Sequence, residues 1–75
     1  MPVRARVNTL DELGTALREF RMRSKLTQRE LAAELGVSQR YIWELEHGKP
    51  GVLTDRLFNV FRLLSIKMTL EQMDQ

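Results

Sequence analysis

Gln39, Arg40 and Glu44 are the side chains of this 75-residue chain whose types and spacing best suit recognition of base edges. The amide of Gln39 can donate and accept at once, as an adenine edge requires, and the guanidinium of Arg40 matches O6 and N7 of guanine. Glu44 lies one helical turn after Arg40, where it can accept from N4 of cytosine or orient the arginine. The three residues therefore predict a surface that reads DNA bases.

A second set of side chains is suited to phosphate groups, whose contacts fix the position of a protein on DNA. We expect Ser38 to donate to a phosphate while it caps a helix. Gln28 should do so at the start of the preceding helix, where backbone N–H groups are free. Further phosphate candidates are Arg18, Lys25, Arg29, His47 and Lys49. Arg18 and Lys25 have an equally good explanation as cations near the C-terminus of the first helix, where they complement the helix dipole.

Trp43 has three competing interpretations. Its indole N–H can donate to a phosphate, its ring can contact a thymine methyl group, or it can pack against the loop at 49–53. We favour the packing interpretation. His47 is the one histidine of the chain, and a metal role would need partner ligands that the sequence does not supply.

Two short helices joined by a tight turn must position these side chains, over residues 27–46. Thr27 and Glu30 have the spacing of a capping box, and Gly36 follows the last apolar residue, where a left-handed conformation is needed. Ala32 is small enough for a second helix to cross above it. Ile42 and Leu45 point that second helix inward, so its polar start faces outward.

The flanking segments predict two more helices and a strand. The first helix runs over about 10–24 and is capped by Thr9. The last starts near Thr54 or Asp55 and runs to about Ser65. Its apolar arc is wider than a small core needs, which suggests that Phe58 or Leu63 meets another molecule.

Residues 66–70 alternate apolar and polar side chains, which is typical of a strand. The partner of this strand is either residues 3–7 or the same strand of a second copy. We favour the second copy, because such pairing closes a twofold dimer, and residues 1–8 are then a loose basic arm. The expected dimer interface consists of Phe58, Leu63, Ile66, Met68 and Leu70.

The composition is that of one domain, residues 1–75, with a net charge of +2. Residues 1–50 hold nine Lys and Arg against seven Asp and Glu, so the basic excess lies in the part with the paired helices. We find no nucleophile–base set, glycine-rich phosphate loop, metal cluster, apolar run near 18 residues or signal peptide. We expect no enzyme activity, cofactor, metal or membrane association, and the absence of cysteine fits the cytoplasm.

The frame of Gln28, Ala32, Gly36, Val37, Ser38, Ile42, Leu45 and Glu46 resembles the Xre/Cro family of repressors. LREFR at 17–21 is similar to that family's first helix, and ELEHGKP at 44–50 to the exit of its motif. The segment LTQRELAAELGVSQRYIWELEHGKP, the short length and the ending LLSIKMTLEQ most resemble HipB-type antitoxins. The resemblance implies a mainly α, four-helix, Cro/C1-repressor-like helix-turn-helix domain with a short C-terminal β-strand that pairs across a dimer. It also implies a partly buried ion pair between Arg21 and Glu46.

The function implied by this resemblance is that of a dimeric, sequence-specific DNA-binding repressor, whose partner is double-stranded operator DNA with an inverted repeat. HipB-type proteins are antitoxins, so a HipA-like kinase toxin is a further implied partner. Two alternatives stay open: a protein-interaction module for which DNA binding is secondary or lost, and a stand-alone phage-type repressor.

Overall fold

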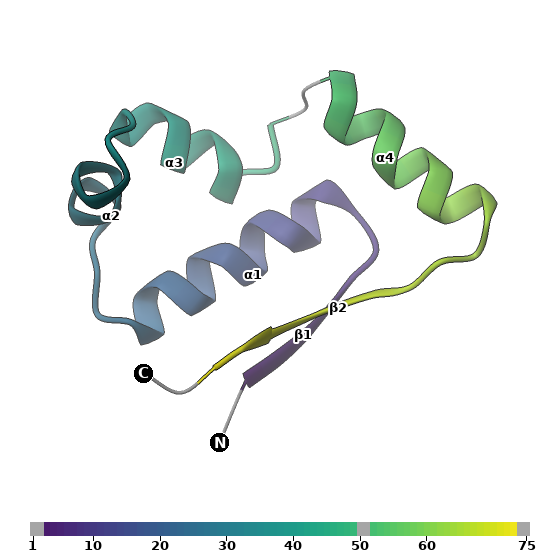
Figure 1. Ribbon diagram of the computed structural model, residues 1–75, viewed down its shortest axis with the longest axis horizontal. Coiled ribbons are helices and arrows are strands. Elements are labelled where there is room, and N and C mark those ends of the chain that lie inside the picture. The colour runs from purple at the N-terminus through teal and green to yellow at the C-terminus, as the bar shows by residue number, and fades with distance from the viewer. Residues whose placement is uncertain (1–2, 50–51, 74–75) are drawn as a thin grey trace.

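The central helix α1 lies between the two helices that follow it in the chain and a small sheet in the computed structural model, which describes residues 3–49 and 52–73 (Figure 1). The chain begins with a strand, continues through four helices and ends with a second strand. In chain order these are β1 (Val3–Val7), α1 (Leu10–Arg23), α2 (Gln28–Leu35), α3 (Gln39–Glu46), α4 (Val52–Leu63) and β2 (Met68–Gln72). The protein is thus mainly helical, as predicted.

Local capping groups set the ends of α2 and the start of α3, and these predictions are confirmed. Thr27 and Glu30 form a reciprocal capping box, and Gly36 ends α2 with a left-handed φ of 69°. The hydroxyl oxygen of Ser38 accepts from the backbone N–H of Tyr41. Because each signal involves residues at most four apart, it acts before any tertiary packing.

The two outer helices follow their predictions less closely. Thr9 caps α1, but the carboxylate of Glu12 accepts from the backbone of Asn8 and not from that of Thr9. Helix α4 begins at Val52, before the predicted start at Thr54 or Asp55. Residues 50 and 51 of the predicted loop at 49–53 lie outside the described residues.

The two strands pair with each other, and this corrects two predictions. Strands β1 and β2 run antiparallel, with Ala5 opposite Leu70. The preference for a second copy as the partner of the C-terminal strand is therefore wrong, and so is the predicted loose arm over residues 3–7, which form β1. Residues 1 and 2 of that arm lie outside the described residues. Strand β1 pairs with the backbone groups on one edge of β2 within the same chain. The strand also lies two residues later than predicted, so Ile66 is outside it.

The core lies between α1, the sheet and α4. Three residues of the predicted dimer interface, Phe58, Met68 and Leu70, belong to this core or pack against it. Val7, Ala16 and Phe58 are its buried members, and Phe58 is only 4 % exposed. Met68 and Leu70 pack against this cluster from β2. A side chain buried within one chain has little surface left for a partner. Phe58 is thus a core residue, and Met68 and Leu70 face their own core.

Candidate nucleic-acid interface

The start of α3 carries the predicted base-reading side chains on its outer surface. Gln39 and Arg40 in the first turn of α3 are exposed, whereas Ile42 and Glu46 further along the helix are buried. The cap at Ser38 occupies one lone pair of its hydroxyl oxygen and leaves the hydroxyl hydrogen available to a phosphate. The helix therefore presents a polar, uncovered first turn, while Ile42 and Glu46 anchor it to the rest of the protein.

The anchor is the predicted pair of Arg21 and Glu46, which the structure confirms. Nε of Arg21 donates to Oε2 of Glu46 and Nη2 donates to Oε1 at 3.1 Å, with side-chain exposures of 11 % and 2 %. Nη1 of Arg21 donates to the carbonyl oxygen of Leu26 at 2.8 Å. One guanidinium thus ties α1 to both the start of α2 and the end of α3.

Hydrogen bonds and neighbouring charges keep Arg21 and Glu46 ionised although both side chains are largely buried. Burial acts to raise the pKa of the Glu46 carboxyl. Hydrogen bonds from Arg21 and Gln28, together with the positive charges of Arg21 and Arg18, outweigh burial, and the pKa lies below its ordinary value. The hydrogen bond to Glu46 raises the pKa of Arg21. Both groups therefore stay ionised, and neither is left as an unpaired buried charge.

Gln28 belongs to the same network, which differs from its predicted role. Its Nε2 donates to Oε1 of Glu46 at 3.0 Å, and the residue is half-buried. The predicted phosphate contact needs the same amide group. One N–H of the amide is already used by Glu46, so a phosphate would have to bind the other. The residue also borders a shallow polar depression between α2 and α3, lined by Arg21, Leu26, Thr27, Gln28, Arg29 and Gln39.

Gly14 is a positioning residue that the sequence-based prediction missed. A Cβ atom at this position would lie 2.6 Å from the carbonyl oxygens of both Leu45 and Glu46. Helix α1 can therefore approach the end of α3 only because residue 14 has no side chain. The available signal was a lone glycine inside an otherwise helical pattern, which often marks close packing.

Arg40 and Glu44 interact with each other. Nε of Arg40 lies 3.3 Å from a carboxylate oxygen of Glu44, and the two side chains are 87 % and 45 % exposed. This arrangement fits the interpretation that Glu44 orients the arginine. An exposed pair of this kind is weak enough to open when a base edge is offered.

Trp43 lies further along α3 and packs against two other phosphate candidates. Its ring stacks on that of His47, with centroids 3.9 Å apart and planes 18° apart. Nζ of Lys49 lies 5.6 Å from the centroid of the Trp43 ring, within the range of a cation–π contact. The contact with Lys49, the first residue of the loop at 49–53, agrees with the favoured interpretation that Trp43 packs against this loop. Residues 50 and 51 of that loop lie outside the described residues.

The candidates form two groups at opposite ends of α3. Near its start are Arg29, Ser38, Gln39 and Arg40, and near its end are Trp43, His47 and Lys49. Arg18 is exposed on α1, and Lys25 is exposed in the turn before α2, where its φ is 60°. No helix within residues 3–49 and 52–73 is long and apolar enough to cross a membrane.

Comparisons with known proteins agree with this geometry. An uncharacterized HTH-type transcriptional regulator, y4mF, of Sinorhizobium fredii (strain NBRC 101917 / NGR234) is 36 % identical over 59 residues, which cover 79 % of this chain and 78 % of that protein. No solved structure matches the chain significantly. Residues 12–62, which include all four helices except the first two residues of α1 and the last of α4, match the family described as a helix-turn-helix domain. The chain therefore belongs to the helix-turn-helix domain family and is a DNA-binding regulator of that family.

Proposed function

We propose that this protein is a sequence-specific transcriptional repressor that reads operator bases with Gln39 and Arg40. The observation that carries the proposal is the exposed polar start of α3, held in place by the Arg21–Glu46 network. A helix presented in this way can enter the major groove with its first turn on the base edges. The relative named as a transcriptional regulator supports the same role, which involves no catalytic chemistry and is exercised in the cytoplasm.

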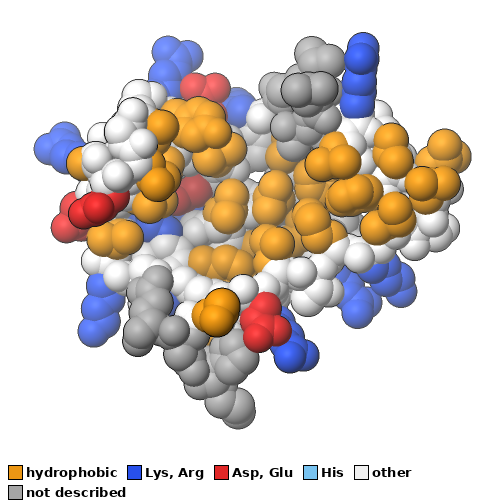
Figure 2. Space-filling model, in the orientation of Figure 1, with side chains coloured by type: hydrophobic (Ala, Val, Ile, Leu, Met, Phe, Trp, Pro, Cys, Tyr) orange, Lys and Arg blue, Asp and Glu red, His pale blue; other side chains and the backbone are white. Residues whose placement is uncertain are grey.

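The repressor acts as a homodimer on an inverted repeat. Helix α4 supports this part of the proposal through an apolar stripe, which consists of Leu57 and Val60 in the helix and Leu64 directly after it. These residues are 49 %, 47 % and 62 % exposed. Figure 2 shows hydrophobic side chains gathered over α4 on one face of the molecule. Leu63, at 84 % exposed, and Ile66 extend this apolar surface. A twofold dimer would cover the stripe and direct two copies of α3 to two half-sites.

Selection of binding sequences from random duplexes, followed by footprinting, tests the proposal. We expect an enriched inverted repeat, protection of both half-sites and two chains per duplex. The matched variant is Arg40→Ala, which should lose the enrichment and keep weak general binding to DNA. Binding of one chain to a single half-site, or no enriched sequence at all, would contradict the proposal.

The repressor is further proposed to be the antitoxin of a HipA-type kinase and to repress its own operon. The resemblance of LTQRELAAELGVSQRYIWELEHGKP and LLSIKMTLEQ to HipB-type proteins supports this proposal. Co-purification with the product of a neighbouring kinase-like gene tests it. A chain that binds such a product and no specific DNA would favour the interaction-module alternative. A chain that binds its operator and has no such neighbour would favour the stand-alone repressor.

A further inference from the structure

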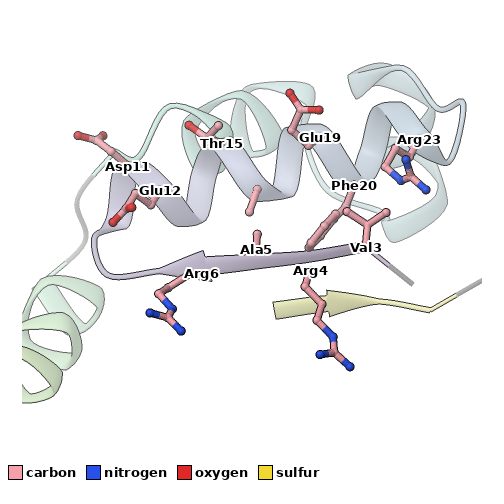
Figure 3. A pocket seen from close by; sticks show the side chains of 11 residues that line it. Val3, Arg4, Ala5, Arg6, Asp11, Glu12, Thr15, Glu19, Phe20 and Arg23 are labelled. Carbon is pink, nitrogen blue, oxygen red and sulfur yellow. The ribbon is translucent and has the colours of Figure 1, made fainter. Parts of the chain in front are cut away.

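A groove of about 480 Å³ runs between α1 and β1 (Figure 3). Four consecutive residues of β1, Val3, Arg4, Ala5 and Arg6, line it, although their side chains alternate between the two faces of the sheet. No residue of β2 is among its lining. The groove therefore runs along the edge of β1 that β2 does not occupy, where backbone N–H and C=O groups have no strand beside them.

The wall opposite this edge is formed by two rows of side chains on α1. One row consists of Glu12, Ala16 and Phe20, of which Ala16 and Phe20 contribute to the core, and the other consists of Asp11, Thr15, Glu19 and Arg23. Small side chains at Thr15 and Ala16 leave room at the middle of the groove. A strand placed there would extend the sheet and rest its inward side chains on α1, provided that these are small and apolar.

The charge on β1 determines what the outward side chains of such a strand must be. Arg4 and Arg6 both point away from α1, on the open face of the sheet (Figure 3). On the β2 side, Arg4 is already paired with an acid, because its Nε lies 2.9 Å from Oε2 of Glu71. A strand on the free side would place its outward side chains beside the same two arginines. Aspartate or glutamate at alternate positions would complement them.

A second copy of this chain fits the groove poorly. Antiparallel pairing of two β1 strands about Ala5 would set Arg4 opposite Arg6 twice, and directly opposed like charges destabilise a sheet. The β2 strand of a copy carries Glu71 and would match the charge. However, an edge of β1 joined to an edge of β2 is a head-to-tail contact, which generates rings or open-ended filaments and cannot close a twofold dimer.

We propose that the free edge of β1 binds an extended segment of a partner protein by strand addition, with acidic side chains alternating with small apolar ones. The sheet and α3 lie on opposite sides of α1 (Figure 1). The partner segment would therefore leave the DNA-reading surface uncovered, and a bound partner and bound DNA are compatible. The inference does not rest on the proposed repressor function, because it uses none of the DNA-reading residues.

Nuclear magnetic resonance titration with two capped heptapeptides tests this proposal. One peptide alternates glutamate with alanine or valine, and the other carries lysine in place of glutamate. We expect the acidic peptide to shift the backbone amides of residues 3–6 and those of α1 that line the groove. The lysine peptide should bind at least about tenfold more weakly, since each charged cross-strand pair contributes up to about 1 kcal/mol.

Two groove variants and one control variant make the test specific. Arg6→Glu should weaken the acidic peptide by about tenfold and strengthen the lysine peptide, while Thr15→Trp should block both by filling the groove. Lys67→Glu makes the same change of charge outside the groove and should alter neither affinity. Thermal unfolding of each variant confirms that it is folded.

Several results would overturn the proposal. They are equal binding of the two peptides, no shifts at millimolar acidic peptide, and shifts confined to other surfaces. Concentration-dependent filaments of the wild type that Arg6→Glu abolishes would identify the β2 strand of a copy as the occupant instead. Operator binding by Arg6→Glu, measured in parallel, keeps a failure of this proposal distinct from a failure of the repressor function.

Discussion

Arg40 is the residue on which sequence specificity should depend most. Arg40→Ala is expected to weaken binding to the operator by about 1–3 kcal/mol and binding to random DNA much less, because a bidentate contact to guanine is lost. Lys49→Ala, as the control, should weaken both duplexes equally and reduce the salt dependence. Fluorescence anisotropy at several salt concentrations measures both effects. An equal loss on the two duplexes for Arg40→Ala would remove this residue from the base-reading set.

The contact of 3.3 Å between Arg40 and Glu44 allows the two roles of the carboxylate to be separated. If Glu44 only orients the arginine, Glu44→Ala should have no further effect in the Arg40→Ala background. If it accepts from cytosine, its effect should persist there. The double-mutant cycle on one operator thus resolves an ambiguity that the sequence left open.

Replacing only one member of the Arg21–Glu46 pair should lower the free energy of unfolding more than replacing both. Arg21→Met leaves a buried carboxylate unpaired, so we expect a loss of about 3–5 kcal/mol in the free energy of unfolding. The double change Arg21→Met with Glu46→Leu should recover most of that loss, although Gln28 then lacks its acceptor. Urea unfolding of the three proteins measures the difference. A single variant as stable as the wild type would show that the pair contributes nothing.

Acid should weaken the fold partly through Glu46. Its pKa in the folded protein lies below the ordinary 4.5, so its contribution is complete above pH 4.5 and is lost as the pH falls through the folded value. We therefore expect the stability gap between the wild type and Glu46→Gln to be constant near neutral pH and to narrow in acid. Urea unfolding from pH 7 to pH 3 tests this. A gap that stays constant to pH 3 would rule out ionisation of Glu46 as its cause.

At the level of elements, the sequence was informative wherever a signal was local. The caps at Thr27 and Ser38 and the left-handed Gly36 placed the turn between α2 and α3 correctly, since these contacts span only a few residues. The Arg21–Glu46 pair came from family resemblance. Close approach at Gly14 was not foreseen, because it depends on where α1 meets the end of α3.

The partner of the C-terminal strand could not be predicted for a related reason. The alternation at 66–70 fits any strand partner, so the choice between residues 3–7 and a second copy rested on a preference for symmetry. Contacts between segments more than 60 residues apart decided it, with Val7 opposite Met68 in register and Val7 buried in the core. Local patterns determine that a strand forms, whereas packing determines its partner.

Because β2 pairs with β1 of the same chain, removing β2 should destabilise the single folded chain. Removing the residues after Lys67 deletes β2, and with it Met68 and Leu70 from the core and the bonds from Gln72 to α1. We expect a lower melting temperature that does not depend on protein concentration, because a single folded chain is affected. Truncation after Met73 is the control and should have little effect. A loss that higher protein concentration restores would instead indicate a strand contact between subunits.

At the scale of the whole molecule, α1 separates three surfaces with different tasks. The start of α3 lies on one side of α1 and the sheet lies on the other, while α4, which carries the apolar stripe, lies near the first turns of α1 (Figure 1). Because the surfaces do not overlap, DNA, a second copy and a partner segment can be tested one at a time. Variants in one surface then serve as controls for the other two.

The arrangement of two copies on DNA is the final prediction. Leu64→Asp places a charge in the exposed stripe of α4, so the dimer should dissociate while the fold persists, since this residue is 62 % exposed. Half-site centres should lie roughly 34–36 Å apart, one turn of DNA. Inserting about half a turn between them should sharply reduce wild-type affinity, because the second half-site moves to the other face of the duplex. The Leu64→Asp variant should bind both spacings equally weakly. Sedimentation and footprinting test these outcomes together, and a variant that remains a dimer and still distinguishes the two spacings would place the dimer contact elsewhere than on α4.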